Sequence, residues 1–204
     1  MPGRRRPSPR THGTEEIRQR ISREAARLIA EEGINDFHAA KRKAAERLNL
    51  PEGQHLPSNS EIERALADHL QLFHARDLPE TLRRLRRLAL QAMRLLERFE
   101  PRLVGSLLTG NVTRFSEIHL HVTANTPELV AFFLQENGIA YEETSKRLRF
   151  GGDRIEVVPV YGFVAENTAI EVSVFTPAAA REAPLSPVDG RPMKRAALKE
   201  VEAL

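Results

Sequence analysis

The residues of this chain with the clearest chemical potential lie in the stretch 104–122, which reads VGSLLTGNVTRFSEIHLHV. Its last six residues alternate polar and apolar side chains, which is the period of a half-buried strand. Glu117 and His119 are therefore expected on one face of that strand, together with His121, which we interpret as structural. Two hard ligands at positions i and i+2 can reach one metal ion. The chemistry that such a pair serves is metal-assisted group transfer.

A turn rich in small residues precedes this strand. Gly105-Ser106 ends an apolar run, and Gly110 and Asn111 break the chain again. A Gly-Ser turn lets backbone N–H groups and a hydroxyl approach a triphosphate without obstruction by larger side chains. The sequence therefore places a candidate phosphate-binding turn about a dozen residues before the candidate metal ligands.

This arrangement resembles the signature of the DNA polymerase beta-like nucleotidyltransferase superfamily, in which a Gly-Ser turn precedes an Asp-x-Asp strand. The resemblance covers roughly residues 103–176, and Glu117 and His119 stand where the family has its two aspartates. Glutamate keeps a charged oxygen, whereas imidazole suits transition ions better than Mg²⁺. The exchange leaves three alternatives open: a weakened site, a site retuned to another metal, or an inactive one.

The resemblance also implies a third acid on a later strand. The candidates are Glu156 in RIEVVPV and Glu171 in AIEVSVF, and we favour Glu171 because its strand is the more regular. With Glu117 and His119 it would hold one or two divalent ions, magnesium or manganese, with zinc as a further alternative.

The same resemblance assigns the remaining site residues. Gly105 and Ser106 would cradle the phosphates of a nucleoside triphosphate, and Arg114 would stabilise their charge. The implied activity is transfer of a nucleoside monophosphate to an acceptor. One alternative is a catalytically inactive fold of this type that binds a nucleotide or nucleic acid, and another is a purely structural or interaction role.

Composition limits the other classes of function. The chain has no cysteine, which excludes disulfides, thiolate metal sites and cysteine nucleophiles. No apolar run is long enough for a transmembrane helix, and the N-terminus lacks the apolar segment of a secretory signal. These features favour a bacterial-type cytoplasmic protein. The net charge of +3 permits a nucleic-acid partner but does not demand one.

The first half of the chain has helical periodicity. We expect a disordered basic tail over residues 1–13 and a helical region over 14–100, with helices over about 14–32, 36–48, 59–75 and 77–99. Asp77 and Glu80 are expected to form a capping box at the start of the fourth helix. The outer face of this helix is basic, so it either covers apolar surface with long side chains or binds RNA or DNA through Arg83, Arg84, Arg86 and Arg87.

Beyond Pro101 the pattern becomes strand-like. Strands are expected over about 102–108, 116–124, 140–150, 155–160 and 169–175, with one helix from Thr126 to Gly138. The expected fold class is α+β: a helical N-terminal portion followed by a nucleotidyltransferase-like mixed sheet with packed helices. This second domain, with a C-terminal tail, is expected to span residues 101–204.

Overall fold

A computed structural model of the protein describes residues 9–50 and 55–204. The fold is α+β, as expected, and the chain divides into two compact units, residues 1–75 and 76–204. Residues 1–8 of the expected tail lie outside the described part, and the helix α1 begins at Pro9, earlier than expected. No helix of the described residues is both long and apolar enough to span a membrane.

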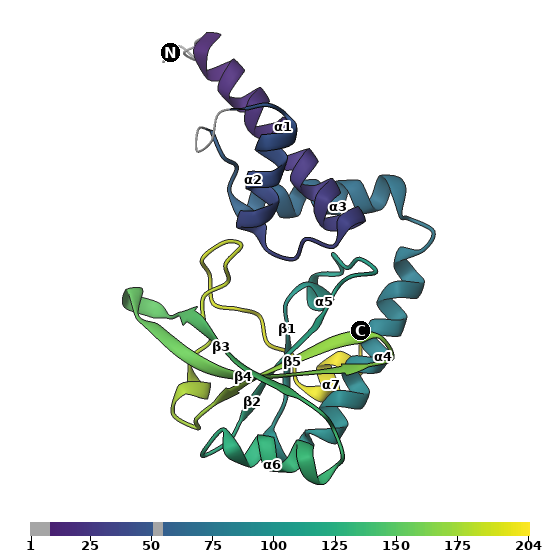
Figure 1. Cartoon of the computed structure of the whole chain (residues 1–204), viewed down its shortest axis with the longest axis vertical. Coiled ribbons are helices and arrows are strands. Elements are labelled where there is room, and N and C mark those ends of the chain that lie inside the picture. Colours follow the sequence, from purple (N-terminus) through teal and green to yellow (C-terminus); the bar gives the residue numbers. More distant parts are fainter. Residues whose placement is uncertain (1–8, 51–54) are drawn as a thin grey trace, which may run out of the picture. The chain divides into compact units, whose positions relative to one another are not determined.

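The first unit is helical (Figure 1). It contains α1 (Pro9–Glu32), α2 (Phe37–Arg47) and α3 (Asn59–Phe73), and α1 packs against the other two. Asp36 caps α2, because its side chain accepts a hydrogen bond from the backbone N–H of Ala39 at 2.6 Å. Ser58 caps α3 and forms a capping box with Glu61.

The second unit is built on a mixed five-stranded sheet with the order β1-β2-β5-β4-β3. Its strands are β1 (Arg102–Val104), β2 (Ile118–Thr123), β3 (Glu142–Arg149), β4 (Ile155–Ala165) and β5 (Thr168–Phe175). β2 and β5 pair in parallel, and all other neighbours are antiparallel. β3 and β4 form a hairpin around the short helix η2 (Gly151–Asp153), and this hairpin extends past the rest of the sheet (Figure 1).

Local backbone conformation overturns two expectations, the end of the first strand and the cap of the fourth helix. The first strand was expected to reach residue 108 but ends at Val104, since Gly105 has φ +84° and turns the chain into the one-turn helix α5 (Ser106–Thr109). The expected capping box of Asp77 and Glu80 is wrong: Asp77 has helical backbone angles and makes no capping hydrogen bond with its side chain.

The helix α4 (Leu78–Leu95) belongs to the sheet rather than to the first three helices. The expected division near residue 100 therefore moves to Ala75/Arg76. The physical reason is the apolar stripe of α4, whose buried residues join the core of the sheet. The helix ends at Leu95 and is followed by the 3-10 turn η1 (Glu97–Phe99), so it is shorter than expected.

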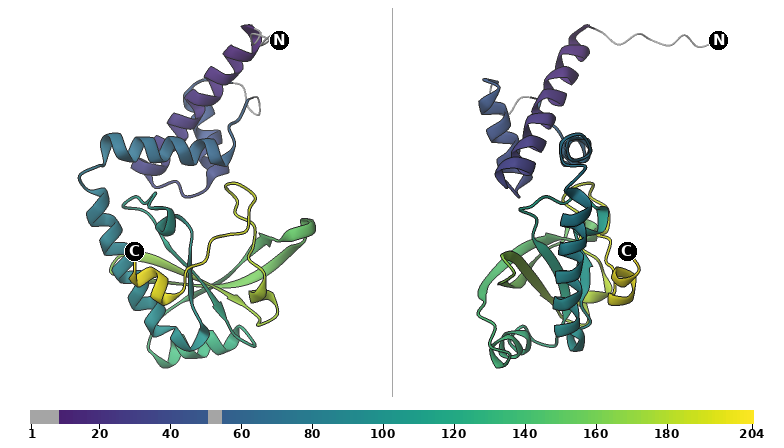
Figure 2. Two further views of the ribbon diagram at one scale, coloured as in Figure 1. Left: turned by 180° about the vertical axis from the view of Figure 1, so that it is seen from behind. Right: turned by 90° about the vertical axis from the view of Figure 1, so that its right-hand side faces the viewer.

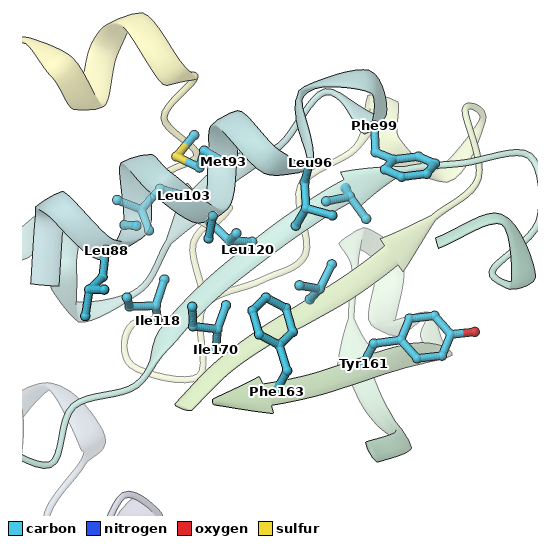
Figure 3. Packing of buried hydrophobic residues seen from close by; sticks show 14 of the residues in the cluster. Leu88, Met93, Leu96, Phe99, Leu103, Ile118, Leu120, Tyr161, Phe163 and Ile170 are labelled. Atoms are coloured by element: carbon cyan, nitrogen blue, oxygen red, sulfur yellow. The ribbon is translucent and has the colours of Figure 1, made fainter. Parts of the chain in front are cut away.

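One face of the sheet carries the core of the second unit. Leu88 of α4 and Leu96, the residue after this helix, lie over Ile118, Leu120 and Ile170 of the sheet (Figure 3). The helices α6 (Glu128–Glu136) and α7 (Leu198–Glu202) add further apolar side chains to the same core, and α7 lies beside α4 (Figure 2). Between β5 and α7 the chain forms the short helix η3 (Ala179–Arg181) and a bridge between Leu103 and Ala196. The opposite face of β2 and β5 carries polar side chains along most of its length and Phe175, part of a smaller apolar cluster, at one end.

This packing predicts a large cost for truncating a central residue. Leu120 is fully buried, so Leu120→Ala is expected to lower the free energy of unfolding by about 2–5 kcal/mol, measured by chemical denaturation. The matched control is Leu129→Ala on α6, where the side chain is 47% exposed and the expected change is within about 0.5 kcal/mol. Equal losses in the two variants would contradict the placement of the core.

Candidate functional site

The centre of the candidate site is the parallel pairing of β2 with β5. In this register His119 lies directly beside Glu171, and on the other side of β2 it pairs with Val104 of β1. Because side chains alternate along a strand, Ile118 and Leu120 are buried on the core face while His119 and Glu171 share the opposite face. Their side chains are 35% and 23% exposed, so both are reachable from solvent.

Glu117 completes a cluster at this position. One possible ligand atom from each of Glu117, His119 and Glu171 lies within 4.8 Å of the other two. Zinc and similar ions bind nitrogen and oxygen ligands at about 2.0–2.2 Å, so the tetrahedral ligands of one ion stand about 3.3–3.6 Å apart. The three side chains therefore need to close by up to about 1 Å to bind one ion.

A fourth residue, Lys146 of β3, also belongs to the cluster. Its ammonium group reaches across β4 and donates a hydrogen bond to Oε2 of Glu171. Nδ1 of His119 lies 2.8 Å from the same oxygen. The hydrogen bond from His119, with help from Lys146, lowers the pKa of Glu171 to about 2 and outweighs the effect of burial, which raises it. Glu171 is therefore a carboxylate at neutral pH.

The predicted phosphate-binding turn lies against the cluster. A Cβ atom built on Gly105 would stand 3.4 Å from Cδ2 of His119, so the turn backbone passes directly beside the imidazole. Ser106 follows as the first residue of α5. Arg114 lies farther along the loop, between α5 and β2, and its guanidinium stacks on the ring of Phe115 at 4.6 Å.

The two candidates for the third acid lie far apart. Glu156 pairs with Leu148 at the outer part of the β3–β4 hairpin, and Nε of Arg154 lies 3.3 Å from its carboxylate. In β4 it is Gly162 that pairs with Glu171, six residues beyond Glu156, which corresponds to about 20 Å along the strand. The structure thus places Glu171, and not Glu156, beside Glu117 and His119.

His121 lies farther along β2 than the cluster and is buried. Its ring stacks against Phe175 at 4.7 Å between centroids. Burial, with the neighbouring charge of Arg195, lowers its pKa to about 3, so the imidazole is neutral at pH 7. This environment fits the interpretation of His121 as structural.

The arginines of α4 make contacts within the second unit. Arg84 donates to Oγ1 of Thr168 at 2.9 Å, and Arg87 forms an ion pair with Glu166 at 2.7 Å. Arg86 donates to the backbone oxygen of Leu204, and Arg83 donates to that of Pro79 in its own helix. Three of these four guanidinium groups therefore connect α4 to the β4–β5 turn or to the C-terminal end.

Lys146 is the residue of the cluster that the sequence did not indicate. It stands in a polar strand, EETSKRLR, where no local pattern distinguishes it from its charged neighbours. Only the pairing of β3 with β4, and of β4 with β5, brings it to Glu171. The spacing of Glu117 and His119, in contrast, was visible in the sequence.

Comparison with models of protein families, with curated proteins and with solved structures finds no match. The geometry of the cluster therefore carries the functional interpretation.

The turn at Gly105 passes close to the ring of His119. We therefore expect that a single methyl group added at Gly105 affects both stability and this ring. Gly105 has φ +84° and ψ −157°, a conformation that is essentially restricted to glycine. Gly105→Ala is expected to lower the free energy of unfolding by about 1–3 kcal/mol and to broaden or shift the NMR signals of the His119 ring. Gly162→Ala is the control, because Gly162 has ordinary backbone angles and no atom closer than 4.0 Å to the added Cβ. An unchanged stability of Gly105→Ala would contradict this backbone geometry.

Proposed function

We propose that the protein is a divergent nucleotidyltransferase that uses a divalent metal ion held by Glu117, His119 and Glu171. The observation that carries the proposal is the convergence of these three side chains, from the start of β2 and from β5, to within 4.8 Å. Two carboxylates and an imidazole form a donor set that fits such an ion. The partner is a nucleoside triphosphate.

The roles of the residues follow from their positions. A bound ion would supply charge neutralisation at the phosphates. The turn at Gly105 and Ser106 offers backbone N–H groups and a hydroxyl next to His119, where phosphate oxygens need donors. Arg114 adds positive charge from the loop that leads into β2. The reaction forms a bond between an acceptor oxygen and the α-phosphorus and releases pyrophosphate.

The donor set favours particular metals. Mg²⁺ prefers an all-oxygen octahedron, whereas an imidazole nitrogen suits Mn²⁺ and, more strongly, Zn²⁺. We therefore expect a metal preference that differs from that of a site with two aspartates. The imidazole of His119 is the cause of this difference.

A second candidate function is a catalytically inactive fold that binds a nucleotide or nucleic acid. The observation that favours it is the ammonium group of Lys146, which occupies a lone pair of Glu171 and already neutralises part of its charge. In that case the cluster is a set of ion pairs without a metal. Nucleic acid would then bind through Arg83, Arg84, Arg86 and Arg87, with an affinity that falls as salt rises.

Calorimetric titration tests the first candidate. Mn²⁺, Zn²⁺ and Mg²⁺ are titrated into the protein, followed by ATP, CTP, GTP and UTP in the presence of each metal. Glu117→Ala and His119→Ala are each expected to weaken metal binding at least about tenfold, because each removes one ligand of a small set. Glu156→Ala is the matched control, since this carboxylate lies on the same sheet but away from the cluster. Absence of metal binding in the unaltered protein would refute the metal site.

Replacing Lys146 separates the two candidates. If a metal competes with this ammonium for Glu171, Lys146→Met is expected to raise metal affinity about tenfold, because a neighbouring positive charge is removed. Lys146→Arg keeps the charge and is expected to leave affinity close to that of the unaltered protein. If the cluster is instead a set of ion pairs in an inactive fold, Lys146→Met is expected to lower the free energy of unfolding, and the variant is expected to bind no metal.

A further inference from the structure

A small polar pocket of about 240 Å³ lies at the end of β2, on the face of the sheet opposite the core. Four side chains of three adjacent strands line it: Arg102 of β1, His121 and Thr123 of β2, and Phe175 of β5. Arg102 pairs with His121, and paired residues of neighbouring strands share a face. Thr123 lies two residues beyond His121 and pairs with Phe175, so both belong to the same face.

The C-terminal segment forms another wall of this pocket and positions the guanidinium group of Arg195. Ala196 exchanges backbone hydrogen bonds of 2.8 and 2.9 Å with Leu103, which keeps the segment beside β1. Nη1 of Arg195 donates a hydrogen bond to the backbone oxygen of Ala180, in η3, at 2.8 Å. Arg195 and Ala180 both line the pocket. The guanidinium is therefore held at the pocket before a ligand binds, which reduces the entropy cost of binding.

His121 brings a buried polar group that has no partner. The residue is 6% exposed, and its Nδ1 makes no hydrogen bond with any residue that the structure describes. Buried polar groups in folded proteins are nearly always hydrogen-bonded, so an atom of this kind indicates a ligand or an ordered water molecule. An imidazole has at least one N–H donor in either charge state, and it can offer that donor to an anion.

Positive charge predominates in the lining. Among the described residues that line the pocket, Arg102 and Arg195 are basic and Glu100 is acidic, which gives two positive charges against one negative. Glu100 and Arg102 are exposed, so the pocket is open to solvent at the edge of the sheet. A concave surface in which one sign of charge predominates attracts ligands of the opposite sign. The volume is below the roughly 300–1,000 Å³ of pockets that enclose a whole drug-sized ligand, so it suits one small anionic group.

We propose that this pocket binds a phosphate group, either the free ion or the phosphate of a monoester, through Arg102, Arg195 and an N–H of His121. Guanidinium groups donate pairs of hydrogen bonds to phosphate oxygens. A tetrahedral phosphate presents its oxygens to donors that approach from several directions, whereas a planar carboxylate presents two. Donors from β1, from β2 and from the C-terminal segment therefore favour the phosphate.

The phosphate pocket is distinct from the candidate site. Arg102 pairs with His121, whereas Val104, the residue before the turn at Gly105, pairs with His119. His121 lies two residues beyond His119, about 7 Å along the strand. Binding of phosphate here needs neither a metal ion nor a transfer reaction, so the inference stands apart from the proposed function.

Calorimetric titration of three probes into the metal-free full chain tests the preference: inorganic phosphate, phenyl phosphate and benzoate. The tighter of the two phosphates is expected to bind at least about fivefold more tightly than benzoate, because it accepts more charge-assisted hydrogen bonds. Tighter binding of phenyl phosphate than of the free ion would identify a monoester as the ligand, and equal or weaker binding would identify the ion. Benzoate binding as tight as that of both phosphates, or no saturable phosphate binding, would overturn the proposal.

Replacing Arg195 tests the guanidinium. Arg195→Met is expected to weaken phosphate binding at least about tenfold, and Arg195→Lys by about threefold, because lysine keeps the charge but not the paired donors. Arg191→Met is the matched control: it makes the same change in net charge in the same segment, outside the lining, and is expected to leave the affinity unaltered. Equal losses in Arg195→Met and Arg191→Met would show that net charge alone attracts the anion.

Replacing His121 tests the unpartnered nitrogen. His121→Phe keeps an aromatic ring against Phe175 and removes both ring nitrogens. It is expected to weaken phosphate binding by about threefold or more, with the circular dichroism spectrum retained. Unchanged phosphate affinity in this variant would contradict the role of His121 as a donor.

NMR spectroscopy separates this pocket from the proposed phosphate-binding turn. Phosphate added to the metal-free protein is expected to shift the ring signals of His121 and the side-chain N–H signals of Arg195, and to leave the backbone amides of Gly105 and Ser106 in place. Shifts confined to Gly105 and Ser106 would support the turn of the proposed function and reject the pocket. Shifts at His121 and Arg195 in a protein that binds no metal would keep the pocket and reject the metal site.

Discussion

The second unit depends on the parallel pairing of β2 with β5. These strands are about 50 residues apart in the chain, and their register sets both faces of the sheet at once. On one face it aligns Leu120 with Val172 in the core. On the other it puts His119 beside Glu171. A shift by one residue would bury the polar pair and expose the apolar one, so the hydrophobic effect that fixes the core also fixes the site.

The helix α4 protects this pairing from one side. Its apolar stripe covers the central strands, and its arginines reach the β4–β5 turn and the last residue of the chain. Arg84, for example, donates to the hydroxyl of Thr168, a buried polar group that needs a partner. The arginine-rich face that suggested a nucleic-acid partner therefore also has a structural role. Long arginine side chains serve such contacts well, because their stems cover apolar surface while their charged ends remain near solvent.

The site combines negative and positive groups in a small volume. Glu117 and Glu171 favour a cation, and Lys146 competes for the carboxylate of Glu171. Under the proposed function, the balance between a metal ion and the lysine ammonium would decide whether the cluster holds a metal or is a set of ion pairs. Both states satisfy the charge of Glu171, and a buried or half-buried carboxylate needs such compensation.

Local patterns in the sequence determined the fold class, most elements and the pair Glu117 and His119, because periodicity and spacing are properties of neighbouring residues. They did not determine the end of β1, which depends on the backbone angles of Gly105, or the attachment of α4 to the sheet. The sequence favoured Glu171 over Glu156, but the position of Glu171 beside His119 and the presence of Lys146 came only from the tertiary structure. Strand order and register join residues far apart in the chain, and no local pattern records which distant strands will pair.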